Sequence, residues 1–201
     1  MSEEKKKQIL AAAKECFVRF GYKKTTLDDI GRKIGLNKAS IYYYFKNKEE
    51  IFTTIVLSEF EQFTSKLRQD ISEDMSCDQK VLIYFRDRHG FWSHNSMIQA
   101  LIGYIDPEKA QLFREAGIEL YMKIEREEKS FIASILQNCI KIGQIKECNV
   151  EQISDFLFAL VDGIKEKHMR FSDTVLLTPS GNEVMIKEAE TALSIFLNGL
   201  K

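Results

Sequence analysis

The stretch TTLDDIGRKIGLNKASIYYYFKNKEE, residues 25–50, contains three tyrosines and a phenylalanine in a row close to several lysines. Thr26 is a good N-cap for a short helix, and Asp28 and Asp29 suit the positive end of its dipole. Gly35 begins a tight turn, after which Asn37 can cap a second helix. The stretch therefore predicts two short helices joined by a tight glycine turn.

The second of these helices should reach about Phe45 and present two different faces. At about 100° per residue, Ile41, Tyr44 and Phe45 lie together on one side, where they would form part of a core. Ala39 and Tyr43 point away from that core, with Ser40 and Tyr42 on its flanks. Two of the four aromatic rings are therefore expected to face water, beside cations.

Two helices joined in this way form a helix-turn-helix, whose second helix enters the major groove of DNA. Gly31 precedes Gly35 by four residues and lies where the helices cross, so a larger side chain would hold them apart. Residues at the start of the second helix would reach base edges, and phenols and cations around them would hold phosphates. The candidate DNA contacts are Thr26, Lys38, Ala39, Ser40, Tyr42, Tyr43 and Lys48.

This stretch resembles the TetR family of bacterial transcriptional regulators, whose signature here is an aromatic cluster followed by a polar residue, Lys and Glu. The residues that match are Gly21-Tyr22, Thr25-Thr26, Ile30, Gly35-Leu36, Lys38, Tyr42, Tyr44-Phe45 and Lys48-Glu49-Glu50. The resemblance is dense over about the first 55 residues. The chain departs from the family pattern at Asp28, at Gly31, where alanine is commoner, and at Asn37, where serine or threonine is commoner.

The resemblance implies a homodimer that binds double-stranded DNA and a small-molecule effector. Residues 1–47 would form the helix-turn-helix DNA-binding domain, and residues 48–201 would form a helical domain for effector binding and dimerisation. The expected function is that of a repressor released from a palindromic operator by a small, partly apolar effector. No cofactor is expected.

Most of the chain has apolar residues at spacings of three and four and few prolines, which predicts an all-α protein of about nine helices. The first helix should end near Gly21, and a long one capped by Asn47 should run to about Ile71. Gly117 and Gly143 are candidate helix breaks. Further helices are expected near residues 77–93, 95–104, once or twice between 107 and 145, and at 150–171 and 182–199, the last after a loop at 179–181.

The net charge of −1 conceals a strong asymmetry. Residues 1–48 contain 12 Lys and Arg against 5 Asp and Glu, a balance of +7, which leaves 17 basic and 25 acidic residues, or −8, for the rest. The N-terminal part can attract a polyanion, whereas the remainder would be repelled by it. This distribution favours DNA as a partner of the N-terminal part.

The four cysteines, at positions 16, 77, 139 and 148, have no close spacing that suggests a disulfide framework or a zinc site. We therefore expect reduced cysteines in a cytoplasmic protein. No segment is apolar for long enough to cross a bilayer, and the N-terminus lacks the apolar core of a signal peptide. His89 and His94 have no neighbours at metal-ligand spacing, and no catalytic motif is present, so we expect neither a metal site nor an enzyme.

Some aromatic side chains of the middle region would line the effector cavity that the resemblance implies, although packing in the core is the alternative for each. The candidates are Phe63, His89, Trp92, Tyr104, Tyr121 and Phe158. The last two helices are apolar on more than one face, which favours a four-helix interface between two subunits over packing within one subunit. The candidate interface residues are Phe156, Leu160, Ile164, Leu193, Phe196 and Leu197.

Two other functions remain open. The chain could be a DNA-binding protein that organises the chromosome or acts through protein partners, without any effector. It could also be a helical protein that binds or converts a small molecule, with an incidental basic end. An internal pocket separates the first alternative from a ligand-responsive regulator, and salt-sensitive DNA affinity separates the second.

Overall fold

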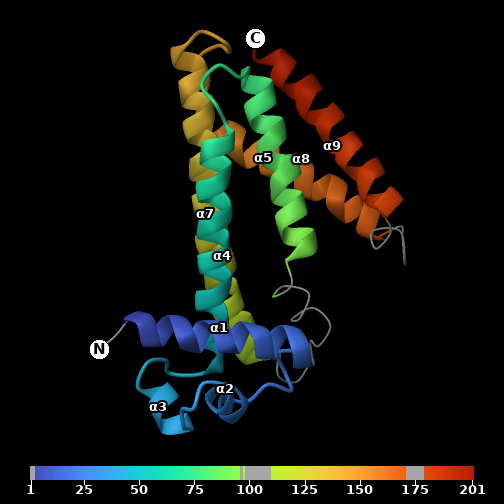
Figure 1. Cartoon of the computed structure of the whole chain (residues 1–201). Coiled ribbons are helices and arrows are strands. Elements are labelled where there is room, and N and C mark those ends of the chain that lie inside the picture. The colour runs from blue at the N-terminus through green and yellow to red at the C-terminus, as the bar shows by residue number, and fades with distance from the viewer. Residues whose placement is uncertain (1–2, 96, 98–109, 171–178) are drawn as a thin grey trace. The chain divides into compact units, whose positions relative to one another are not determined.

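The computed structural model describes residues 3–95, 97, 110–170 and 179–201, and every regular element in these ranges is an α-helix. Figure 1 shows these helices in chain order. The predicted all-α fold is therefore confirmed. The helices are α1 Glu3–Phe20, α2 Leu27–Lys33, α3 Lys38–Tyr42, α4 Lys48–Asp70, α5 Cys77–His94, α7 Ala110–Lys141, α8 Val150–Arg170 and α9 Pro179–Gly199.

Most helix boundaries agree with the predictions, and three differ. The helix α3 ends at Tyr42 rather than Phe45, because the amides of Tyr44 and Phe45 both donate to the Ile41 carbonyl and close the helix. The helix α7 continues through residue 117, so glycine there does not break it. The helix α9 begins at Pro179, since proline is well suited to the first helical position, where no N–H bond is needed. Most of the helix expected at 95–104 lies outside the described residues.

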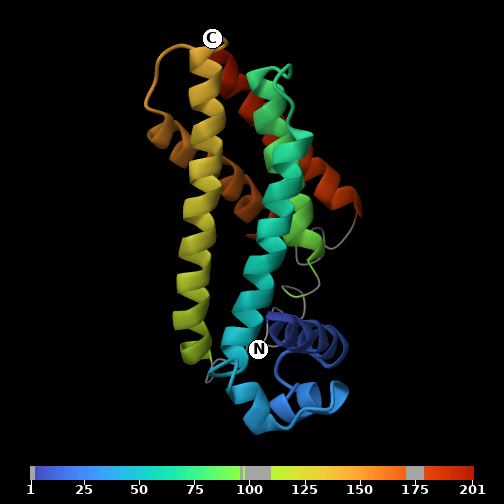
Figure 2. The same cartoon turned by 60° about the vertical axis from the view of Figure 1, so that its left-hand side comes forward.

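The chain divides into two compact units. The first contains residues 1–65 and 91–124, and the second contains residues 66–90 and 125–201. In the first unit, α1, α2 and α3 pack around a core shared with the start of α4 (Figure 2). Its fully buried side chains include Ile9, Phe17, Ile30, Ile41, Ile51 and Phe52.

Three aromatic rings hold the centre of the first unit together. The ring of Phe17 lies 5.3 Å from Tyr22 and 5.7 Å from Phe52, and Tyr22 lies 5.2 Å from Phe52, measured between centroids. The tilted and edge-on arrangements of these rings are favourable for aromatic pairs. They connect α1, the loop after it and α4.

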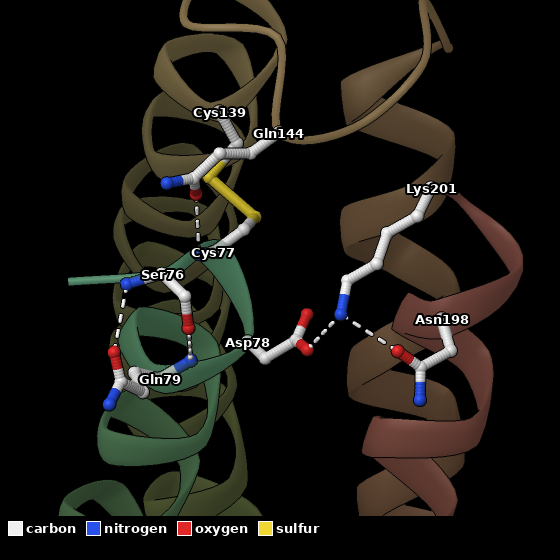
Figure 3. A network of polar contacts seen from close by, with 8 residues as sticks. All are labelled: Ser76, Cys77, Asp78, Gln79, Cys139, Gln144, Asn198 and Lys201. Carbon is white, nitrogen blue, oxygen red and sulfur yellow. Dashed lines mark hydrogen bonds and ion pairs between the residues drawn. A yellow bond between two sulfur atoms is a disulfide. The ribbon is translucent and has the colours of Figure 1, made fainter.

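In the second unit, a disulfide joins Cys77 at the start of α5 to Cys139 near the end of α7 (Figure 3). The expectation that all four cysteines are reduced is therefore wrong for this pair. The two cysteines are 62 positions apart, and no local sequence pattern pairs them. Their proximity arises only when α5 and α7 pack side by side, which brings the two Cα atoms to 5.7 Å.

Polar contacts surround this disulfide (Figure 3). The amide of Cys77 donates to Gln144 Oε1 at 2.6 Å, and Gln144 follows the turn that ends α7. Gly143 in this turn has a φ of 72°, which confirms that it stops the helix. On the next residue of α5, Asp78 accepts from the ammonium group of Lys201 at 2.5 Å. These contacts tie the C-terminal end of the chain to α5 and the end of α7.

Within the described residues, no helix is both long and apolar enough to span a membrane.

The helices α8 and α9 pack against each other, with the rings of Phe156 and Phe196 stacked at 4.6 Å.

Candidate nucleic-acid interface

The turn between α2 and α3 is fixed by hydrogen bonds to a single carbonyl. The amides of Ile34 and Leu36 both donate to the Gly31 oxygen, at 3.1 and 2.9 Å. Gly35, between them, has a φ of 67°, a conformation that favours glycine. A Cβ atom on Gly31 would lie 2.3 Å from the Leu36 carbonyl oxygen, so the predicted need for a small residue at the crossing is confirmed.

The short helix α3 has the inner and outer faces that its sequence predicts. Ile41 is completely buried, Phe45 is 5% exposed and Tyr44 packs partly buried against the same core. Tyr43 is 76% exposed and Tyr42 is 49% exposed, although both are large aromatic side chains. Two exposed phenols lie side by side in the chain, that of Tyr42 at the end of α3 and that of Tyr43 at its C-cap, and they mark this face as a candidate contact surface.

A cation and two phenols lie together on this outer face. The ammonium group of Lys38 is 5.8 Å from the centre of the Tyr42 ring, one helical turn further on. The ring of Tyr43 meets that of Tyr44 edge-on at 5.1 Å, which steadies it although it is exposed. Ala39 is exposed on the same short helix. The surface thus combines positive charge with hydrogen-bond donors, as phosphate binding requires.

Asn37 and Ser40 have a structural role at the start of α3. The Asn37 side chain accepts from the Ser40 amide at 2.8 Å, which confirms it as the N-cap. Ser40 Oγ donates to the same oxygen at 2.9 Å. The hydroxyl keeps its acceptor capacity for an outside donor.

Thr26 likewise has a structural role, as the N-cap of α2. Its hydroxyl accepts from the Asp29 amide at 3.1 Å, and both its hydroxyl and its amide donate to Asp29 Oδ2, at 2.6 and 2.9 Å. This is a complete capping box. The hydrogen bonds from Thr26, with the nearby guanidinium of Arg32, hold the pKa of Asp29 below its ordinary value.

Lys48, a candidate phosphate contact, is turned toward the protein. Its Nζ atom donates to the carbonyl oxygens of Tyr22 and Thr25, at 2.9 and 2.8 Å. The next residue, Glu49, accepts a hydrogen bond of 2.8 Å from the Tyr22 hydroxyl. Sequence reasoning missed this set of contacts, and the only signal for it was the presence of Tyr22 and Lys48-Glu49 in the same family signature.

A shallow hollow of about 390 Å³ lies between α1 and α2. Two of its cations are already paired, because Lys33 contacts Glu15 and Arg32 contacts Asp29 at 2.5 Å. The hollow is therefore a poor site for an anion. Its lining residues are Glu15, Cys16, Arg19, Phe20, Asp29, Arg32 and Lys33.

Two of the effector candidates belong to an aromatic cluster of the first unit. Phe63 stacks on Phe91 at 4.7 Å, and Trp92 stacks on Phe60 at 6.1 Å. Tyr121, also in the first unit, is 58% exposed. Tyr104 lies outside the described residues. A role of these rings in effector binding stays a prediction.

The other two candidates belong to the second unit. His89 is partly buried, and Phe158 is 3% exposed beneath the guanidinium of Arg88, whose Cζ lies 5.0 Å from the ring centre. Arg88 pairs with Glu128 at 2.9 Å and Asp162 at 3.1 Å. Burial disfavours the charged guanidinium, but the two carboxylates outweigh it and raise the pKa of Arg88. This buried ion-pair cluster was not predicted from the sequence.

The candidate interface residues divide into two groups. Leu193 and Leu197 are fully buried within the single chain, at 1% and 0% exposure. Phe156 is 48% exposed, while Leu160, Ile164 and Phe196 are partly buried. Ile195 is a further exposed apolar side chain of α9, at 70% exposure.

The chain is similar to known transcriptional regulators. The model of the family described as bacterial regulatory proteins, tetR family, matches residues 9–55. The HTH-type transcriptional regulator YhgD of Bacillus subtilis is 32% identical over 157 residues, which are 75% of this chain and 77% of the relative.

Solved structures share the fold over nearly the whole chain. A transcriptional regulator from Cytophaga hutchinsonii has a TM-score of 0.72 at 23% identity, covering 98% of this chain and 99% of that one. The regulator FadR from Bacillus subtilis, in complex with stearoyl-CoA, has a TM-score of 0.58 at 21% identity, covering 97% and 99%.

Proposed function

This chain belongs to the TetR family of bacterial transcriptional regulators, and from that premise we propose that it is a cytoplasmic repressor released from a palindromic operator by a small effector. As a DNA-binding regulator it needs a surface for the duplex, a second copy and a site for the signal.

The outer face of α3 is the main support for DNA binding. Lys38, Tyr42 and the C-cap residue Tyr43 are exposed there, and residues 1–48 have a charge balance of +7. With α3 in the major groove, Lys38 and Ala39 would reach base edges, while the phenols of Tyr42 and Tyr43 would donate to phosphates on either side.

The outer surface of α8 and α9 supports a homodimer. Along α8, exposed Phe156, Ala159 and Gly163 follow at spacings of three and four, so they lie on one face. A Cβ atom on Gly163 would meet no other atom within 4 Å, which leaves room for the backbone of another helix. Ile195 of α9 adds an exposed apolar side chain. Two copies would form a four-helix interface and carry two copies of α3 about 34 Å apart.

An apolar effector fits the composition of the C-terminal part. Its helices contain many aromatic side chains, and the similar FadR regulator was solved with stearoyl-CoA. The effector would lower operator affinity only if it binds more tightly to a dimer whose α3 helices are differently spaced. We propose the aromatic candidates Phe63, His89, Trp92, Tyr104, Tyr121 and Phe158 as the first positions to examine for this site.

Selection of bound duplexes from a random DNA pool tests the proposal. We expect the pool to converge on an inverted repeat and the affinity to fall steeply with salt, since each phosphate contact releases counterions. Lys38→Ala should change the preferred sequence, whereas Tyr42→Phe should weaken binding to all sequences alike. A pool that stays random, with no salt dependence, would rule out a DNA-binding role.

A second selection, with an extract of cellular metabolites added, tests the effector. Loss of the bound duplexes in the presence of the extract supports a ligand-responsive repressor. Unchanged binding with every extract fraction would favour a DNA-binding protein that works without an effector.

A further inference from the structure

The first turn of α4 holds the loop between α1 and α2 from one side. The ammonium group of Lys48 has three N–H donors, and two of them are directed at the carbonyl oxygens of Tyr22 and Thr25. The same group lies 4.3 Å from the centre of the Tyr22 ring, close enough for a cation–π contact. Lys48 therefore binds both ends of the loop 22–25.

Glu49 fastens the same loop through the Tyr22 hydroxyl, 2.8 Å away. The Tyr22 side chain is 8% exposed, and its ring packs on Phe17 and Phe52. Burial, and then the hydrogen bond to Glu49, raise the pKa of Tyr22 above its ordinary value, so the phenol keeps its proton at neutral pH. We call Tyr22, Lys48 and Glu49 the α4 clamp.

The loop held by the α4 clamp continues directly into α2. Thr25 is 1% exposed, and its hydroxyl lies within hydrogen-bond distance of the carbonyl oxygens of Cys16 and Gly21, at 3.1 and 2.9 Å. The next residue, Thr26, caps α2. The loop is thus fixed by α1 on one side and by α4 on the other, and it fixes where α2 begins.

We propose that Lys48 is a positioning residue for DNA binding, which sets α2 and α3 through the α4 clamp and does not itself bind phosphate. This inference rests on the proposed function. It replaces the phosphate contact expected from the sequence, because the ammonium group is occupied by backbone carbonyls. It also makes Tyr22 and Glu49, which were not among the DNA-contact candidates, determinants of operator affinity.

Salt dependence separates positioning from direct contact. Lys48→Met keeps most of the side-chain length and removes the charge, and Tyr22→Phe breaks the bond to Glu49 without changing the charge. Lys46→Met is the matched control, since it removes the same charge from an exposed lysine two residues away. Each variant is titrated with a duplex that the parent protein selects from a random pool, at several salt concentrations.

We expect Lys48→Met and Tyr22→Phe to lower affinity roughly three- to tenfold, with the parent's slope of log K against log salt. A slope for Lys48→Met that is shallower by about 1, with Tyr22→Phe binding like the parent, would mean that Lys48 contacts phosphate and would overturn the inference. Parent-like affinity for Lys48→Met would overturn it as well.

Amide hydrogen exchange tests the α4 clamp without DNA. Lys48→Met should speed exchange in residues 22–33, and Lys46→Met should not. Equal exchange in the two variants would overturn the inference even if the parent bound no duplex. Absence of salt-dependent binding by the parent, together with faster exchange in Lys48→Met, would instead reject the proposed function and leave the α4 clamp as a structural device.

Discussion

A single hydrogen atom at Gly31 decides how closely α2 approaches the turn that follows it. We expect Gly31→Ala to lower the free energy of unfolding by about 1–3 kcal/mol, because the added Cβ would lie 2.3 Å from the Leu36 oxygen and the turn must shift. Urea unfolding followed by circular dichroism measures the change.

Gly90 offers the matched control for this substitution. It lies within α5, and a Cβ atom there would meet nothing within 4 Å. Gly90→Ala should leave stability unchanged or raise it by up to about 1 kcal/mol, because alanine favours helix. Equal effects of the two substitutions would show that the approach at Gly31 is not limiting.

Asp29 links the stability of α2 to pH. Its folded-state pKa lies below the ordinary value of 3.8, so its contribution is present above about pH 4 and is lost as the pH falls through the lowered folded value. Asp29→Asn should therefore flatten the fall of the unfolding free energy below pH 4. Urea unfolding at a series of pH values measures this.

The cap that lowers this pKa can be removed separately. Thr26→Val deletes the hydroxyl that bonds Asp29, so the pKa of Asp29, followed by NMR, should rise toward its ordinary value. An unchanged pKa in this variant would assign the shift to the Thr26 amide and Arg32 instead.

For single residues, the sequence predicted which side chains face the core and which face water, but it did not predict their hydrogen-bond partners. The division of Ile41 from Tyr43 follows from helical periodicity alone, because each position turns by a fixed angle. The partners of Lys48 depend on the path of a loop 23 to 26 residues earlier in the chain. No local pattern encodes that path, and so the sequence suggested a phosphate contact.

Helix ends were predictable where a side chain or glycine defines them. Asn37 and Asn47 each accept an amide three residues on, and Gly143 has the positive φ expected of a terminator. No capping or turn residue stands beside Gly117 in the sequence. The helix α7 continues through it, because one glycine costs a helix only about 1 kcal/mol. The pairing of Cys77 with Cys139 was not predictable, since it depends on how α5 packs on α7.

The disulfide between α5 and α7 should contribute measurably to stability. We expect reduction to lower the free energy of unfolding by about 2–5 kcal/mol, because the bond restricts the unfolded chain. Thiol titration in denaturant should find two reactive cysteines, Cys16 and Cys148, before reduction and four afterwards.

A control and an in-cell measurement complete this test. Cys148→Ser should leave the effect of reduction unchanged, because Cys148 is a free thiol. Identical urea curves for reduced and oxidised protein would contradict a stabilising role. Since disulfides are rare in a reducing cytoplasm, alkylation of thiols in intact cells would report what fraction of the protein carries the bond.

For the molecule as a whole, the proposed dimer face is open to a direct test. Gly163→Gln combined with Ile195→Glu fills the open position on α8 and places a charge on α9, so we expect the dimer to dissociate at least about tenfold more readily. Sedimentation equilibrium measures this, and affinity for a two-half-site duplex should fall in parallel.

Ile142→Glu is the control for the dimer face. Ile142 is 49% exposed but follows α7 and belongs to neither α8 nor α9. It should leave the oligomeric state as in the parent. A monomeric parent, or a double variant that dimerises like the parent, would exclude this face as the interface.

The covalent link between Cys77 and Cys139 has a practical consequence for anyone who digests the protein. A protease that cuts once between these residues produces two pieces that stay attached through sulfur. On a gel without reductant the nicked chain therefore keeps the full mass of 23.3 kDa, and the cut becomes visible only after thiol treatment. Cleavage maps made without reductant would report this region as resistant, whatever its true accessibility.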